Sequence, residues 1–462
     1  MALSSYTIKS WTGGISDEAK VGVAGSFRNG FNMNIHKKGS NTLSANQKLK
    51  SIGGATIKDK IIKLVPISKT KSYGFGDAGY IYKIENEVVT EINKDTNGKI
   101  LDADYFYGYL YWTTSQKLGR MKESDLSGYN QNFKTLYNCD YHPIFIAPKS
   151  DQMFIGNDNF VAMLDSNGNI NQDALDLFMG WSVRCLDLKK PELLIGAVSH
   201  KNAELFTWDF ISQDESYNPV EGWEERDINA ILTAVGGQYL FTPTLLYWFR
   251  EGLVDLVKEL PSQVNPGAID IWKNKMIFGC NNGVYSLHRR NRNYPLALNL
   301  EYTPSPITLS NFSSKNIDIG AVLGRGDQVL VSWKDGTSYG LDILDNTAKA
   351  ETLYEGLMFD SQRPEEKLFR HIKLVTKPLP KGCSVRVKYR MNDSDTWVAA
   401  KMEDKNTNDD KEIYDRENGT KAIYTIEGQG ENYQVRVELY PSGNNTPEIL
   451  EIHNYFKLVT LY

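Results

Sequence analysis

The sequence has few residues of the kinds that build metal centres and disulfide frameworks. Its 462 residues include only four cysteines, Cys139, Cys185, Cys280 and Cys383, and six histidines, and no two cysteines stand in a CxxC spacing. Zinc sites and disulfide scaffolds of small domains need closely spaced ligands or cysteine clusters. The sequence therefore predicts reduced, separately buried cysteines, with no metal site and no cofactor.

Long apolar segments are missing as well. No run approaches the roughly 18 apolar residues that suggest a membrane-spanning helix, and Met1–Tyr6 lacks the charged and then apolar pattern of a secretory signal. The net charge of −5 is not the basic excess of proteins that coat nucleic acid. We therefore expect synthesis in the cytoplasm, no membrane insertion and no nucleic-acid partner.

Catalytic signatures are also absent from the sequence. The chain has no GxSxG, HExxH, Walker A or GxGxxG element in a fitting context. Adjacent carboxylates such as Glu224 and Glu225 serve a glycosidase only when the fold places them across a pocket, which linear spacing does not show. No residue receives a catalytic assignment, and we expect a protein that is not an enzyme.

The chain is rich, by contrast, in aromatic residues and glycine: 26 Tyr, 18 Phe, 9 Trp and 37 Gly. Aromatic side chains suit pleated, half-buried strands, and glycine suits the turns between them. No helix-length apolar stripe recurs along the chain. This composition predicts an all-β fold.

One strand–turn–strand pattern recurs between residues 59 and 350. At 273–291 two apolar runs flank the dipeptide Asn282-Gly283, which accepts the positive φ of a tight hairpin. Upstream apolar segments such as 61–66 supply an inner strand. Similar copies cover 73–84, 105–121, 151–168, 191–210, 237–252 and 327–344. Their spacing of roughly 35 to 50 residues is the period of four-stranded blades. It predicts a β-propeller of about seven blades over residues 59–350, with six or eight as alternatives, in preference to a pair of β-sandwiches.

The pattern changes after residue 350. The segment 384–389 reads Ser-Val-Arg-Val-Lys-Tyr, a strict alternation that places one face of a strand in a core and the other in water. The segment 432–440 also contains alternating positions. Residues 351–462 are therefore predicted to form a separate, jelly-roll-like antiparallel β-sandwich.

Residues 1–58 have no sustained periodicity and are predicted to form an extended N-terminal arm. Residues 1–60 carry nine Lys or Arg against three acidic residues, whereas the rest of the chain is net acidic. Because aromatic residues and Arg dominate binding hot spots, Trp11, Arg28 and Phe31 are the predicted docking anchors on a neighbouring subunit. The alternative is that the arm completes a blade of its own propeller.

The order of these elements resembles that of a known family. The segments WTGGISDEAKVGVAGSFRNGFNMNIHKKGS, SYGFGDAGYIYKI and PLPKGCSVRVKYRMNDSDTW are similar to virion structural proteins of tailed bacteriophages, and the similarity covers nearly the whole chain. The resemblance implies a tail- or neck-associated virion protein, made in the host bacterial cytoplasm and present in several symmetric copies. Its implied partners are other virion proteins of the tail, neck or portal-proximal region, and a host surface glycan or receptor.

Two functions stay open at this point. The first is a non-enzymatic virion component that mediates protein–protein assembly and adhesion to the host surface. The second is a glycan-cleaving propeller enzyme with a carbohydrate-binding sandwich module. Two or three acidic residues converging with an Arg or Tyr at one mouth of the ring would favour the enzyme.

Overall fold

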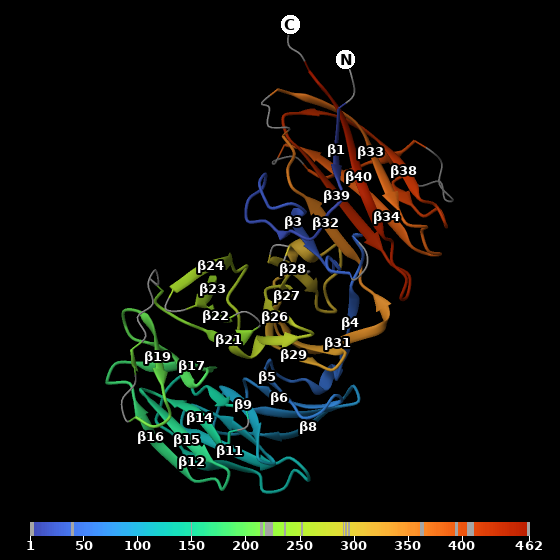
Figure 1. Cartoon of the computed structure of the whole chain (residues 1–462). Helices are drawn as coiled ribbons and strands as arrows, with labels where there is room; N and C mark the ends of the chain where they lie inside the picture. Colours follow the sequence, from blue (N-terminus) through green and yellow to red (C-terminus); the bar gives the residue numbers. More distant parts are fainter. Residues whose placement is uncertain are drawn as a thin grey trace. The chain divides into compact units, whose positions relative to one another are not determined.

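The computed structural model describes residues 4–37, 41–148, 150–212, 216–217, 225–234, 237–250, 253–289, 291, 293, 296–360, 365–392, 396–403 and 411–459. These residues form an almost entirely β structure (Figure 1), interrupted by short 3-10 turns at Gly54–Thr56, Pro266–Ala268 and Phe312–Ser314. None of the helical turns in the described part is long and apolar enough to span a membrane.

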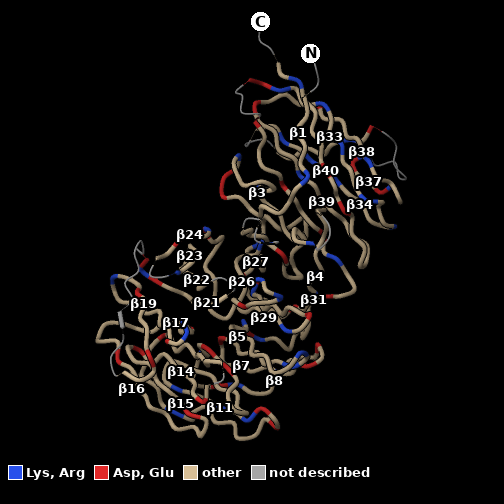
Figure 2. The backbone as a smooth tube through the Cα atoms, viewed as in Figure 1, with Lys and Arg blue, Asp and Glu red and all other residues tan. Residues whose placement is uncertain are grey.

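Contacts divide the chain into two compact units. Unit 1 consists of Met1–Lys50, Gly283–Lys315 and Leu344–Tyr462, and unit 2 consists of Ser51–Asn282 and Asn316–Ile343. Figure 2 shows acidic and basic residues interspersed along both units, with no single region that gathers one sign of charge. The chain therefore enters unit 1 three times.

Unit 2 contains four-stranded antiparallel sheets whose strands follow one another in chain order (Figure 1). The first two sheets are β5 (Ile61–Pro66), β6 (Lys71–Gly76), β7 (Tyr80–Glu85) and β8 (Val88–Lys94), then β9 (Asp102–Phe106), β10 (Tyr109–Thr113), β11 (Lys117–Lys122) and β12 (Asn130–Thr135). The next two are β13 (Ile144–Ile146), β14 (Gln152–Asn157), β15 (Phe160–Asp165) and β16 (Ile170–Asp176), then β17 (Ser182–Lys189), β18 (Glu192–Val198), β19 (Ala203–Trp208) and β20 (Ser216–Tyr217). A fifth sheet holds β21 (Ala230–Ala234), β22 (Gly237–Phe241), β23 (Leu245–Arg250) and β24 (Leu253–Glu259).

Further strands extend the series. The pair β25 (Ile269–Trp272) and β26 (Lys275–Cys280) is antiparallel. Another four-stranded sheet has the order β29 (Asp318–Arg325), β30 (Gln328–Asp335), β31 (Ser338–Lys349) and β4 (Gln47–Ile52). The first strands contact one another in a closed cycle, from β5 through β9, β13, β17, β21, β25 and β29 back to β5.

Separate hydrophobic clusters lie between successive sheets of this cycle. One cluster contains Tyr73 of β6 and Trp112 of β10, and another contains Leu205 of β19 and Leu240 of β22. A further cluster joins Tyr82 of β7 to residues of β29, β30 and β31. A single four-stranded sheet leaves both faces uncovered, so stacking each sheet on its neighbours buries those faces. Unit 2 is thus of the β-propeller type, in agreement with the predicted class.

The predicted repeat is confirmed at the level of individual strands. The predicted inner strand at 61–66 is β5, and the copy at 73–84 contains the end of β6 and most of β7, in which Gly74 pairs with Tyr82. The copies at 151–168 and 327–344 likewise contain the antiparallel pairs β14–β15 and β30–β31. Of the predicted turn dipeptide, Asn282 has a positive φ, at 66°, whereas Gly283 does not and is the first residue of β27 (Gly283–His288).

Two sheets of unit 1 share one core. The first has the order β1 (Ser4–Ile8), β40 (Ile449–Leu458), β33 (Lys367–Thr376), β38 (Lys421–Gly430) and β36 (Lys401–Met402). The second contains β27 (Gly283–His288), β28 (Ala297–Tyr302), β3 (Ser26–Phe31), β32 (Thr352–Gly356), β39 (Tyr433–Tyr440), β34 (Ser384–Met391) and β35 (Val398–Ala399), with β2 (Gly14–Ile15) beside β3 and β37 (Ile413–Tyr414) beside β34. Phe369 of the first sheet stacks on Tyr433 of the second, with ring centroids 4.3 Å apart. Along β34 buried and half-buried residues alternate, as the sequence predicts.

The N-terminal residues do not form one extended arm. β1 pairs with β40, β3 lies between β28 and β32, and β4 is the last strand of the β29–β30–β31 sheet. The contact units therefore differ from the predicted domains 1–58, 59–350 and 351–462. Main-chain pairing needs no apolar repeat, so short Gly- and Asn-rich strands leave no periodic signal in the sequence. The alternative weighed above, in which N-terminal residues complete a blade, describes the position of β4.

Candidate functional site

A cavity of about 520 Å³ opens at the end of the ring where the inner strands begin. Its lining comes from six successive sheets and includes Lys60, Asp102, Tyr141, Arg184, Asn229 and Asn265, all at or just before an inner strand. Cavities of this size, with polar groups converging on them, are typical of ligand sites. We refer to it as the mouth cavity.

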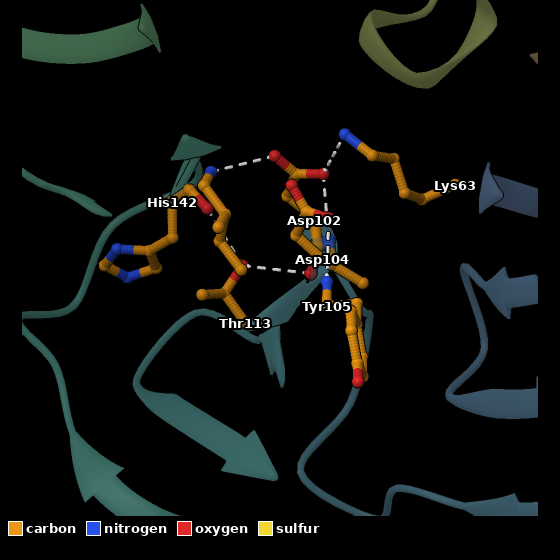
Figure 3. A network of polar contacts seen from close by, with 8 residues as sticks. Lys63, Asp102, Asp104, Tyr105, Thr113 and His142 are labelled. Atoms are coloured by element: carbon orange, nitrogen blue, oxygen red, sulfur yellow. Dashed lines mark hydrogen bonds and ion pairs between the residues drawn. The ribbon is translucent and has the colours of Figure 1, made fainter. Parts of the chain in front are cut away.

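Asp102 joins three neighbouring sheets at this cavity (Figure 3). Its Oδ1 lies 2.8 Å from Lys63 Nζ of β5, and its Oδ2 accepts the main-chain N–H of Ile144 in β13 at 2.8 Å. Oδ1 also accepts the N–H of Ala103 at 2.8 Å. Both carboxylate oxygens are therefore engaged by the protein itself, which identifies Asp102 as a structural tie between sheets.

The positive charge of Lys63 also interacts electrostatically with two further carboxylates, Asp104 on β9 and Asp270 on β25. Burial raises the pKa of Asp104 to about 6, although the positive charge of Lys63 opposes the rise. Burial likewise raises the pKa of Asp270 to about 6, while N–H groups of Gly324 and Ile271, each at 2.7 Å, oppose it. Burial alone would lower the pKa of Lys63, but Asp102 and Asp104 raise it above its usual value. One cation thus balances several acidic groups, two of which titrate near neutrality.

Arg184 and Tyr141 form the aromatic side of the mouth cavity. The guanidinium carbon of Arg184 lies 3.5 Å from the centroid of the Tyr141 ring, a cation–π geometry. Arg184 Nε lies 3.8 Å from Asp227 Oδ1, and within the described residues neither its Nε nor its Nη1 has a hydrogen-bond acceptor, although both atoms are buried. Arg184 therefore contributes a guanidinium group, stacked on Tyr141 and close to Asp227, to the lining of the cavity.

His142 also lines the cavity but has a structural environment. Its Nδ1–H donates to Gly156 O at 2.7 Å, and Thr113 Oγ1 donates to the main-chain oxygen of His142 at 2.9 Å (Figure 3). Burial lowers the pKa of His142, so the ring is neutral at physiological pH. It fixes the loop before β13 in place.

The mouth cavity brings together the residue types that the sequence argument associated with the enzyme alternative. Asp140 and Asp227 lie there with Arg184 and Tyr141. Asp227 Oδ1 accepts the N–H of Ile228 at 2.9 Å. Asp104 and Asp270, whose carboxyl pKa burial raises to about 6, do not line the cavity. The described residues also contain no cluster of metal ligands.

The predicted docking anchors lie in unit 1 and do not approach one another as a surface patch. Trp11 is 1% exposed and packs edge-on against Tyr354 at 5.1 Å, and Phe31 is 1% exposed and stacks on Phe312 at 4.3 Å. Both rings belong to the interior because their segments pack within the strands of unit 1. Arg28 is exposed, and its Nη1 donates to Asp17 O at 2.8 Å. Of the three residues, only Arg28 is available on the surface.

Sequence reasoning assigned no function to Tyr141 or Arg184. They stand 43 positions apart in different repeat copies and share only their position near the start of an inner strand. Aligning the copies on their inner strands would have placed them at equivalent ends of neighbouring blades. That alignment is the signal by which the mouth residues could have been found.

Comparisons with known proteins give fold-level likeness only. No family model matches the chain, and neither does any curated protein. Among solved structures it is similar to an extracellular domain assigned to a hybrid two component system of B. thetaiotaomicron, with 14% identity and a TM-score of 0.49, over 78% of this chain and 48% of that one. It is also similar to the WD40 β-propeller domain of Doa1 (12% identity, TM-score 0.46, 65% of this chain and 96% of that one) and to YCF48 bound to a D1 peptide (9%, 0.47, 65% and 96%). The chain thus spans less than half of the B. thetaiotaomicron domain.

Proposed function

We propose that the chain is a non-enzymatic interaction protein that binds a polar ligand or partner in the mouth cavity. The observation that carries the proposal is the Arg184–Tyr141 pair, which places a guanidinium group against an aromatic ring in the lining of a cavity of about 520 Å³. Asp102, the neighbouring carboxylate, is already bound to Lys63 and to a main-chain N–H. The lining therefore offers a guanidinium group and an aromatic ring for recognition, while Asp102 helps to hold neighbouring sheets together.

The proposed architecture is a seven-bladed β-propeller with a β-sandwich. The closed cycle of first strands supports seven blades, because each of β5, β9, β13, β17, β21, β25 and β29 begins one blade. The sandwich is supported by the core that Phe369 and Tyr433 share between two sheets of unit 1. Propellers of this kind hold ligands at the ring mouth without needing a catalytic constellation.

We place this protein in the virion of a tailed bacteriophage, in the tail or neck. The sequence resemblance described above supports this placement, and the partners it implies are other virion proteins and a host surface glycan or receptor. An assembly protein in a symmetric particle needs rigid, repeated surfaces, which a closed ring supplies.

The test has two arms. Mass spectrometry and cryo-electron microscopy of purified particles should find the chain in the tail or neck, and particles without it overturn the virion assignment. Purified protein should bind host surface polysaccharide or a virion neighbour, and Arg184→Gln and Tyr141→Ala should each weaken that binding at least tenfold while leaving the melting temperature of the protein nearly unchanged. Release of sugar products that Asp227→Asn abolishes would establish the glycan-cleaving alternative instead.

A further inference from the structure

Unit 1 contains a second cavity, of about 200 Å³, far smaller than the mouth cavity. Four segments meet there: the N-terminal stretch with Asn34 and Lys37, the end of β31 with Lys349, the loop with Pro380, and the turn before β40 with Asn445 and Glu448. The lining is polar, and two of its residues are lysines.

The negative charge of the one carboxylate in this lining, Glu448, is already balanced by lysine side chains. Lys37 Nζ lies 2.8 Å from Glu448 Oε1, Lys377 Nζ lies 2.8 Å from Oε2, and Thr42 Oγ1 donates to Oε2 at 3.0 Å. Burial alone would raise the pKa of Glu448, but these partners lower it to about 2. Glu448 is therefore ionised across the physiological range, and two lysines share its single charge.

Lys349 is the lysine of this lining that is not paired with Glu448. It is half-buried, and among the described residues no oxygen accepts a hydrogen bond from its Nζ and no carboxylate forms an ion pair with it. Burial lowers the pKa of Lys349, and the neighbouring charge of Lys37 lowers it further, while Glu448 opposes both. An ammonium group in this position is costly unless an anion joins it.

The lining also contains neutral side chains that can donate hydrogen bonds. Asn34 and Asn445 contribute side-chain amides, and no described residue is hydrogen-bonded to either side chain. The Oδ1 of Asn444 accepts from Gln47 Nε2 at 3.2 Å, which fixes the orientation of that amide and leaves its N–H groups free of that bond. A site that offers ammonium and amide N–H groups, with no free carboxylate beside them, is suited to binding an oxyanion.

We propose that this cavity is an oxyanion site that binds a phosphate group, with Lys349 as its principal charged donor. Lys37, Lys349 and Lys377 against Glu448 leave two positive charges. A phosphate group, with a charge of about −1.5 to −2 at pH 7 and several acceptor oxygens, matches this excess better than a carboxylate does. The site lies within unit 1 and is independent of the mouth cavity and its proposed function.

The experiment measures the melting temperature and the binding isotherm of the full chain with inorganic phosphate, phenyl phosphate, acetate and chloride at equal ionic strength. Phosphate should raise the melting temperature, since a ligand that binds only the folded state stabilises it. Acetate and chloride should raise it much less. Inorganic phosphate binding more tightly than phenyl phosphate identifies a free ion as the ligand, and equal affinities identify the phosphate group of a larger molecule.

Lys349→Gln should reduce phosphate affinity at least tenfold, and Lys349→Arg should restore most of it. Without phosphate, Lys349→Gln should melt no lower than the wild-type protein, because it removes an uncompensated ammonium group. Lys401→Gln, an exposed lysine on β36, is the matched control and should leave phosphate binding unchanged. A phosphate effect that chloride or acetate reproduces, or one that survives in Lys349→Gln, overturns the proposal.

Discussion

The side-chain amide of Asn32 donates a hydrogen bond to Thr303 Oγ1 at 3.0 Å, across 271 positions of sequence inside unit 1. The contact is reciprocal, because the N–H of Thr303 donates to Asn32 Oδ1 at 2.9 Å. The same amide donates to Glu351 O at 2.9 Å, and Thr352 Oγ1 donates to Asn32 O at 3.1 Å. Asn32 therefore joins all three chain segments that make up unit 1.

Asn32→Ala should destabilise unit 1 by about 2–4 kcal/mol, because it leaves buried partners unsatisfied and places Ala at a φ of 57°. Thermal and urea unfolding will measure the loss. Asn418→Ala is the control, since Asn418 has a φ of 59° but an exposed side chain. Equal losses in both variants would mean that backbone strain, and not the hydrogen-bond network, accounts for the effect.

The acidic groups around Lys63 predict a pH dependence of stability. The pKa of Asp104 and of Asp270 is about 6 in the folded chain, above the usual value of about 4 in an unfolded one. Between these values the folded state binds more protons, so the free energy of unfolding from these groups falls as pH rises through 6. Asp104→Asn should raise the melting temperature at pH 8 and reduce this slope.

Melting curves between pH 5 and pH 8 will test that expectation. Asp255→Asn, at an exposed position on β24, serves as the control and should leave the slope unchanged. The prediction fails if Asp104→Asn melts at a lower temperature than the wild-type protein at pH 8.

Glu448 predicts the opposite dependence at acidic pH. Its folded pKa of about 2 lies below the usual value of about 4, so its contribution is present above pH 4 and is lost as pH falls from 4 to 2. Glu448→Gln should lower the melting temperature at pH 7 and flatten the acid limb of the stability profile. It should also tighten phosphate binding, since it leaves Lys37 and Lys377 unpaired. Glu431→Gln, an exposed substitution, should do neither.

Substitutions of Trp11 and Arg28 distinguish a role in the core from a role in docking. Trp11→Ala removes a ring that is 1% exposed and should cost about 3–5 kcal/mol of stability. Arg28→Ala should change stability by less than about 0.5 kcal/mol, because the residue is exposed. Incorporation into particles, measured for both variants at a temperature where both are folded, shows which residue contacts a neighbour. Loss of incorporation in Arg28→Ala alone would assign it to a docking surface.

A strand of this fold was predictable where its own sequence carries a local apolar pattern. The inner strand Ile61–Pro66 was predictable because an apolar run stands before a Gly-rich hairpin. The strand Ser26–Phe31 was not, because Phe27 and Phe31 are separated by polar residues and glycine, and its partners β28 and β32 are supplied by chain more than 250 positions away. Local pattern predicts hairpins well, whereas pairing between distant segments depends on the whole fold.

The candidate site was less predictable than the fold. Tyr141 and Arg184 have no shared motif, and their contact arises only when neighbouring blades close the ring. Asp102 similarly stands beside Lys63 because β5 and β9 are adjacent in that ring. The sequence contains these residue types but carries no local mark of their convergence.

The pairing of β1 with β40 has a consequence for how the protein is made. Ser4 lies opposite Phe456, so β1 cannot pair in its sheet until β40 has also been synthesised. A nascent chain that terminates before β40 leaves β1 without its partner strand and leaves part of the core of unit 1 uncovered.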